Sequence, residues 1–332
     1  MPPSSQPVNV SRKFLRLGLA IVVIAALYSA AWFFAANRGA TYLKDILAAP
    51  GGGFSASCGK LDIRGFPFRA GVFCESASLA NATDGLKVET GPVRTMTLVY
   101  NPTKAVFEVD GPIKAELPQG ISLDTNWGNM EGSLHANLQG MTEVSTFVDK
   151  MTTAAGFAGI ADAVKLNVGH AEFHARQNGE NLDIAAMAQE TTLSTPLLPR
   201  QLPLFSTSAE ITVNNRADLL RGARLQPGDE ISGTIQRLAL DFGAEGFLTI
   251  SGPFQIGGDG LISGDFDIDV ENFARLQPLL DASFPESQPV IDASTLLIKG
   301  ISKDGVKGRV KIAVRSGAIL LGVIPIGFIP PL

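Results

Sequence analysis

The stretch LISGDFDIDV, residues 261–270, alternates apolar and acidic side chains with a period of two. In an extended chain Phe266, Ile268 and Val270 would share one face, and the aspartates between them would share the other. The stretch VKGRVKIAVR, residues 306–315, repeats the pattern with cations in place of aspartates. Such alternation is typical of antiparallel strands with one covered and one solvated face, so the sequence predicts a mainly β fold.

The composition also favours short strands joined by turns. The 332 residues include 35 Gly and 20 Pro, and only 18% of them are charged. Helical proteins rarely contain this much glycine. The net charge of −5 is small, and no stripe of lysine and arginine interleaves with aromatic residues. Nucleic acid is therefore not an expected partner.

Three segments, 142–160, 216–225 and 270–284, have the spacing of short amphipathic helices. The order Gly-Pro, strand, glycine, strand, helix occurs once on each side of the middle of the chain, without a linker between the two occurrences. This order suggests two similar halves, at about 54–190 and 191–332. We therefore predict an elongated, curved antiparallel sheet of two similar halves with a few short helices.

The N-terminus predicts a membrane anchor. Residues 17–36, LGLAIVVIAALYSAAWFFAA, carry no charge and follow a tail, residues 1–16, that contains three cations and no acidic residue. About 20 apolar residues in a helix span the ~30 Å hydrocarbon layer. A cleaved signal peptide is the alternative, because small residues lie near the end of the run. An anchored chain would leave the tail in the cytoplasm of a bacterium and cross the inner membrane once.

Both alternatives place the β-rich domain, residues 54–332, in the periplasm. Residues 37–53 are expected to extend the helix and to end it at the glycines of 51–53.

The stretch CGKLDIRGFPFRAGVFC, residues 58–74, contains the only two cysteines. They lie symmetrically about Phe66, so two strands joined by GFPF would place Cys58 opposite Cys74. In an oxidising compartment this spacing predicts a structural disulfide, with two free thiols as the alternative. The pair lacks the Cys-x-x-Cys redox spacing, and two thiols alone do not close a zinc site.

The sequence contains few residues in arrangements typical of catalysis or metal binding. His170, Glu172 and His174 would share one face of a strand, which suits either a metal or a solvated surface, and the solvated surface is the preferred interpretation. The aspartates of 265–269 alternate along a strand and do not have the loop spacing of a calcium site. Nucleophile-elbow, phosphate-loop and dinucleotide motifs do not occur in a strand-to-helix setting. We expect no enzyme, no cofactor and no metal.

Two motifs carry a family resemblance: GFPFR, residues 65–69, and LG-x-x-P-x-G-x-x-P, residues 321–330. With the basic tail and the single anchor, they resemble a family of bacterial membrane-anchored periplasmic proteins of unknown function. That resemblance implies no reaction and no substrate. More distantly, the strand-helix-strand order resembles AsmA-type proteins, whose long curved sheets are thought to carry lipids between membranes.

Two apolar segments remain, TPLLPRQLPLF (195–205) and AILLGVIPIGFIPPL (318–332). They either close the core or line and cap an apolar groove. The candidate lining residues are Leu197, Leu198, Leu202, Leu204, Phe205, Ile319, Leu321, Ile324, Ile326 and Phe328. The expected function is noncatalytic binding or transfer of membrane lipids or lipid-like molecules. A structural or assembly role with an envelope protein partner is the alternative.

Overall fold

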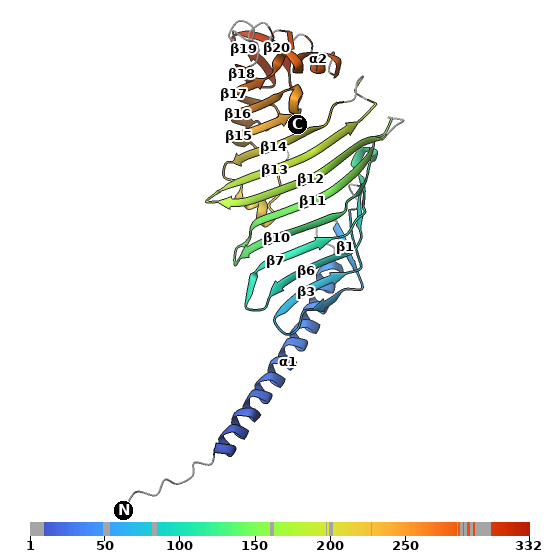
Figure 1. The fold of residues 1–332 in the computed structure, drawn as a ribbon, viewed down its shortest axis with the longest axis vertical. Helices are drawn as coiled ribbons and strands as arrows, with labels where there is room; N and C mark the ends of the chain where they lie inside the picture. The colour runs from blue at the N-terminus through green and yellow to red at the C-terminus, as the bar shows by residue number, and fades with distance from the viewer. Residues whose placement is uncertain are drawn as a thin grey trace, which may run out of the picture.

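A computed structural model describes residues 10–48, 54–81, 85–159, 163–196, 198, 202–226, 228–283, 285, 288, 291–292, 295 and 307–332. A long helix, α1 (Val10–Ala48), leads into one antiparallel sheet of twenty strands (Figure 1). The mainly β prediction, with few helices and an N-terminal apolar helix, is confirmed. The strands are β1 (Phe54–Gly59), β2 (Asp62–Arg64), β3 (Arg69–Cys74), β4 (Ser76–Asn81), β5 (Leu86–Thr90), β6 (Val93–Leu98), β7 (Asn101–Val109), β8 (Ile113–Leu117), β9 (Ile121–Asn126), β10 (Asn129–Asn137), β11 (Gly140–Gly156), β12 (Val164–Asn178), β13 (Asn181–Ser194), β14 (Phe205–Val213), β15 (Ile231–Asp241), β16 (Phe247–Ile256), β17 (Ile262–Glu271), β18 (Lys307–Arg315), β19 (Ala318–Leu321) and β20 (Ile324–Phe328).

The first ten strands are the arms of five long strands, each broken near its middle. One set of arms pairs in the order β1, β4, β5, β8, β9 and β11. The other set pairs in the order β2, β3, β6, β7, β10 and β11. Both sets end on β11, and from there each strand pairs with the next as far as β20. The sheet is therefore a meander throughout.

The breaks between the arms lie side by side and form a crease across the sheet. At Gly91 the neighbouring chain comes so close that a Cβ would lie 2.6 Å from the carbonyl oxygen of Asp110. Farther along, Lys150 and Glu190 have φ angles of 53° and 51° and interrupt their ladders. Bulges and glycine contacts of this kind bend a sheet, which explains why the long strands are curved.

The alternation in 261–270 and 306–315 produces the expected two faces. Across β17 and β18, Asp269 Oδ1 lies 2.7 Å from Arg309 Nε, and Asp267 Oδ1 lies 3.5 Å from Lys311 Nζ. The apolar residues between them point to the other face, where Ile268 pairs with Val310. These ion pairs are exposed and contribute little each, so burial on the apolar face stabilises the two strands more than the ion pairs do.

Only part of the helix prediction is confirmed. The segment 270–284 contains helix α2 (Phe273–Ser283), and 216–225 contains a short 3₁₀ helix, η2 (Ala217–Arg221). The helix expected at 142–160 is wrong, because most of that segment belongs to β11. Long strands flank it on both sides and satisfy its backbone, so tertiary pairing overrides the local spacing. The match between helices in the two proposed halves is therefore wrong as well.

Helices η2 and α2 both cover parts of the apolar face. The α2 cluster consists of Phe242, Val270, Phe273, Leu276, Leu279 and Val310. The η2 cluster consists of Ala175, Leu182, Val213 and Leu220. Among the described residues the sheet thus has two separate buried patches on one face and not one continuous core.

The disulfide between Cys58 and Cys74 is confirmed, with a Cα–Cα distance of 5.3 Å. The predicted register is wrong, because Cys58 faces Ala77 in β4 and Cys74 faces Val93 in β6. The cysteines lie on opposite sides of the crease, and the crease brings them together. Beside them the Glu75 N–H donates to the Gly59 carbonyl at 2.8 Å, across the same break.

Helix α1 is long and apolar enough to cross a membrane, and most of its apolar side chains are exposed. Its C-terminal part contacts β1 and β2 at the start of the sheet. The helix continues without interruption through residues 37–48, as the sequence predicts, while residues 49–53 lie outside the described residues. The finding is consistent with a single-pass anchor.

Candidate functional site

A groove of about 450 Å³ is open on the apolar face of strands β14 to β19. The lining side chains that the structure describes are all apolar: Ile211, Ile235, Leu238, Ile250, Phe254, Ile256, Ile262, Phe266, Ile268, Ile312, Val314, Ile319 and Ile329. Volumes of about 300–1,000 Å³ are usual for ligand pockets. A surface of this composition suits an apolar ligand.

The groove follows from the register of the strands. Ile250 faces Ile268 and Ile256 faces Ile262 across β16 and β17, so their side chains share one face. Two phenylalanine rings of the groove occupy the space left by glycines. A Cβ on Gly233 would lie 2.8 Å from the ring of Phe254. Aromatic rings over strand glycines of this kind strengthen positions that would otherwise lack packing.

The groove lies between the two buried patches. Ile268 and Ile312 line it and also pack against the α2 cluster, while Ile211 lines it and packs against the η2 cluster. Val314 is buried and the other lining residues are half-buried, except Leu238, which is 38% exposed. Removing leucine and isoleucine side chains from water lowers the free energy, so a ligand that covered these side chains would be bound more stably.

An open row of side chains extends from the groove toward β6. Each member faces the next across the ladders, and none is buried. Phe173, near the middle of the row, is 39% exposed. In order, the open row contains Leu238, Ala209, Ala186, Phe173, Thr146, Gly132, Phe107 and Thr95. The apolar face therefore continues beyond the groove through small and aromatic residues.

The residues proposed from sequence lie in several places. Ile319 lines the groove. Phe205 and Leu321 pack against the α2 cluster. The remaining described residues are Leu198, Leu202 and Ile326, which are half-buried, and Leu204, Ile324 and Phe328, which are exposed. Leu197 lies outside the described residues.

Most residues that line the groove belong to β14 to β18, and the sequence analysis did not predict them as lining residues. The signal was present in the alternation of Ile262, Phe266 and Ile268 with aspartates. That alternation marks an apolar face, but only the placement of α2 and η2 shows which part of the face is left uncovered.

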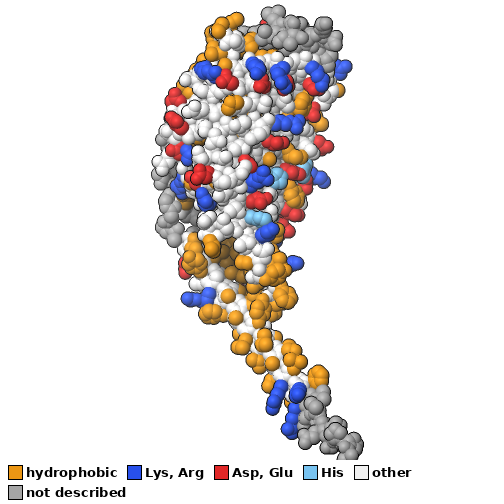
Figure 2. Space-filling model, turned by 90° about the vertical axis from the view of Figure 1, so that its left-hand side faces the viewer, with side chains coloured by type: hydrophobic (Ala, Val, Ile, Leu, Met, Phe, Trp, Pro, Cys, Tyr) orange, Lys and Arg blue, Asp and Glu red, His pale blue; other side chains and the backbone are white. Residues whose placement is uncertain are grey.

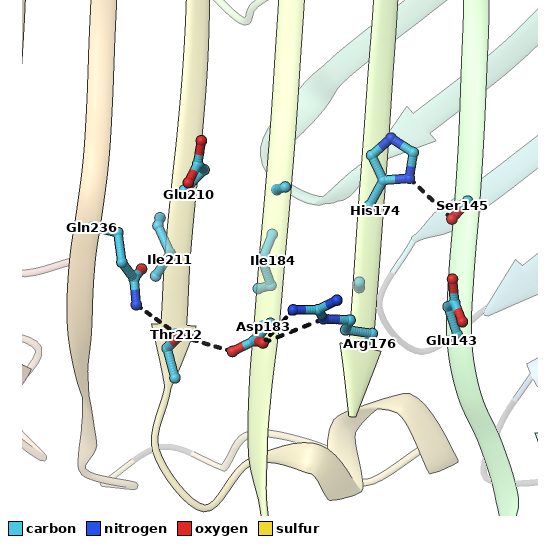
Figure 3. Close-up of a pocket in the computed structure, with 12 residues that line it drawn as sticks. Glu143, Ser145, His174, Arg176, Asp183, Ile184, Glu210, Ile211, Thr212 and Gln236 are labelled. Carbon is cyan, nitrogen blue, oxygen red and sulfur yellow. Dashed lines mark hydrogen bonds and ion pairs between the residues drawn. The ribbon is translucent and has the colours of Figure 1, made fainter. Parts of the chain in front are cut away.

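A second hollow, of about 490 Å³, lies on the polar face over β11 to β15 (Figure 3). Its side chains are bonded to one another. Asp183 accepts hydrogen bonds from Thr212 Oγ1 at 2.8 Å and from Arg176 Nη2 at 3.3 Å, and Gln236 donates to Thr212 at 2.9 Å. These bonds hold neighbouring strands together, which is a structural role.

The histidine row also bonds internally. His170 Nδ1 lies 2.6 Å from Asp149 Oδ1, and its Nε2 lies 2.9 Å from Glu172 Oε1. The other oxygen of Glu172 lies 3.1 Å from His174 Nε2. Asp149 and Glu172 raise the pKa of His170 above its usual value by bonding the protonated ring. Among the described residues no group of three or more such side chains is arranged to hold a metal.

No curated protein and no solved structure matches the chain. A family model described as "Uncharacterized protein conserved in bacteria (DUF2125)" matches residues 32–330, which is nearly the whole chain. The matched range begins inside α1 and includes both the GFPFR motif and the C-terminal motif. The chain therefore belongs to this uncharacterized bacterial family.

Proposed function

We propose that the protein is a noncatalytic, inner-membrane-anchored envelope protein that binds lipid-like molecules in the groove and helps to transfer them along the sheet. The observation that carries the proposal is the groove, whose described lining side chains are all apolar and which lies between the two buried patches. An acyl chain in it would cover side chains that otherwise face water.

The arrangement of the sheet favours transfer over simple storage. Eleven successive strand pairings connect β3, which pairs with the helix-contacting strand β2, to the groove strand β18. At ~4.8 Å per pairing, the apolar face extends roughly 50 Å from the helix. The open row lies along this path, so apolar chains would remain sheltered for much of it.

The proposed orientation is N-terminus in the cytoplasm and sheet in the periplasm. Arg12, Lys13 and Arg16 precede the apolar run and favour retention of the tail on the cytoplasmic side. The disulfide suits an oxidising compartment. A distant relationship to AsmA-type proteins is part of the proposal and rests on the long curved sheet alone.

Native mass spectrometry of detergent-extracted protein tests the proposal. We expect wild-type protein to retain phospholipid or another acylated molecule. Leu238→Asp places a carboxylate in the groove at an exposed position, so the chain should fold but lose at least about tenfold of the bound lipid.

Gln255→Asp is the matched control, because Gln255 is exposed and lies on the polar face of β16 beside the groove residue Phe254. It should retain lipid at the wild-type level. Lipid-free wild-type protein, or equal lipid in Leu238→Asp and wild type, would contradict the proposal.

A second candidate function, assembly with another envelope protein, rests on strand β20. One edge of β20 pairs with β19, and within the described part of the chain no strand pairs with the other edge. Ile324 and Phe328 on this strand are 62% and 61% exposed. A free apolar edge can accept a strand from a partner. A lipid-free protein that copurifies with a stoichiometric partner would favour this function.

A further inference from the structure

The end of the sheet nearest the helix carries an exposed apolar tip. Two side chains of the tip, Phe66 and Phe68, belong to the connection between β2 and β3, and the other two, Val99 and Tyr100, lie at the turn between β6 and β7. Their exposed fractions are 42%, 66%, 41% and 74%. The Val99 N–H donates to the Phe68 carbonyl at 3.0 Å, which joins the two loops. The tip is therefore one surface built from two connections.

The tip is attached to the apolar part of α1. The ring of Phe66 stacks on Phe33 with centroids 5.2 Å apart, and it meets Trp32 edge-on at 5.6 Å. The Tyr28 hydroxyl donates a hydrogen bond to the Pro67 carbonyl. These contacts fix the tip at the level of residues 28–33 of the helix. In Figure 2 hydrophobic side chains continue from the helix onto the lower end of the sheet around a hollow.

The helix residues that contact the tip are expected to lie inside the hydrocarbon layer, deeper than the bilayer surface at Arg38. The uncharged run lies between Arg16 and Arg38, and the 22 steps from one arginine to the other, at 1.5 Å rise each, span about 33 Å, close to the hydrocarbon thickness. Residues 28–33 lie five to ten positions before Arg38, which is about 8–15 Å deeper along the helix axis. A span that begins at Arg16 therefore carries the tip below the headgroups.

We propose that the tip inserts into the periplasmic leaflet of the membrane that α1 crosses, with Phe66, Phe68, Val99 and Tyr100 in contact with phospholipid acyl chains. Aromatic residues are enriched at the boundary between headgroups and acyl chains in membrane proteins. Arg69 follows Phe68 directly, is exposed, and forms no ion pair with a described acidic residue, so its guanidinium is placed to meet lipid phosphate. The base of the sheet is thus a second membrane contact, independent of ligand in the groove.

Quenching of tryptophan fluorescence by brominated phospholipids tests the insertion. The chain has two tryptophans, Trp32 and Trp127. In full-length Trp32→Phe protein reconstituted into phosphatidylcholine vesicles with brominated acyl chains, only Trp127 reports. Adding Phe68→Trp to this background should produce strong additional quenching, and adding Tyr100→Trp provides a second reporter on the other loop of the tip.

Val323→Trp is the control, because Val323 is 92% exposed at the turn between β19 and β20, at the end of the sheet far from α1 (Figure 1). Its emission should be the same with brominated and ordinary lipid. Quenching of Trp32 in wild-type protein without quenching at positions 68 and 100 would overturn the proposal while leaving the anchor intact. No quenching at any of the three positions would overturn both. Neither result depends on whether the groove binds lipid.

Discussion

Loss of the Cys58–Cys74 disulfide should loosen the end of the sheet next to the helix. The two cysteines are 16 residues apart in sequence, and closing a loop of that size removes about 3 kcal/mol of chain entropy from the unfolded state. The bond crosses the crease where the first two long strands change direction. We therefore expect Cys58→Ser to lower the free energy of opening of β1 to β6 by about 3 kcal/mol, with little effect on β14 to β18.

Hydrogen exchange of the detergent-solubilised protein measures this effect locally. A loss of about 3 kcal/mol speeds exchange roughly a hundredfold where amides open together. Amides of β1 to β6 should show this change, and amides of β16 and β17 should keep the wild-type rates. Cys74→Ser should have the same effect, and the double variant should be no worse than either single variant, because one bond is lost in all three.

Two outcomes would refute this reasoning. If the double variant lost nearly twice as much stability as each single variant, the cost would come from the separate side chains and not from the cross-link. If exchange in β1 to β6 did not change, the ladders and the contacts with α1 would hold this end without the bond.

Two further predictions concern the sheet. Gly233→Val should destabilise the protein by about 1–3 kcal/mol in urea unfolding, because its Cβ would lie 2.3 Å from the Thr212 carbonyl oxygen, whereas Thr234→Val on the exposed face should change little. Asp149 and Glu172 raise the pKa of His170 in the folded protein, so the protonated ring stabilises the fold below pH ~6.5. That contribution is lost as the pH rises through the folded-state pKa. Urea stability of His170→Gln should therefore fall less between pH 6 and 8 than that of wild type, and parallel profiles would contradict this.

The strands with strict alternation could be predicted from sequence because their two faces meet different environments. In 261–270 each aspartate is solvated or paired and the apolar residues share the other, half-buried face, so the period of two is visible. The segment 142–160 could not be predicted in the same way. Its polar threonines and serines lie on both faces of β11, and the long neighbouring strands decide its conformation.

The disulfide pairing was predictable from cysteine count and compartment, but its geometry was not. Symmetry about Phe66 would place Cys58 opposite Cys74, but the strands pair about a centre between Pro67 and Phe68, on both sides of the crease, so Cys58 faces Ala77, three residues farther along. The groove was predictable in kind but not in place. The uncharged apolar run at the C-terminus predicts a groove there, whereas the position of the groove depends on which strands α2 and η2 leave open.

The meander has a consequence for how the chain is assembled. From β12 onward each strand pairs with the strand that was made just before it, so the sheet can grow by one hairpin at a time as the chain is delivered. Strand β11 is different, because it must dock on β9 and β10 together. A chain that folds in the order in which it is made, from α1 onward, would close the end of the sheet next to the helix before the groove exists, and β11 would be the point of commitment in folding.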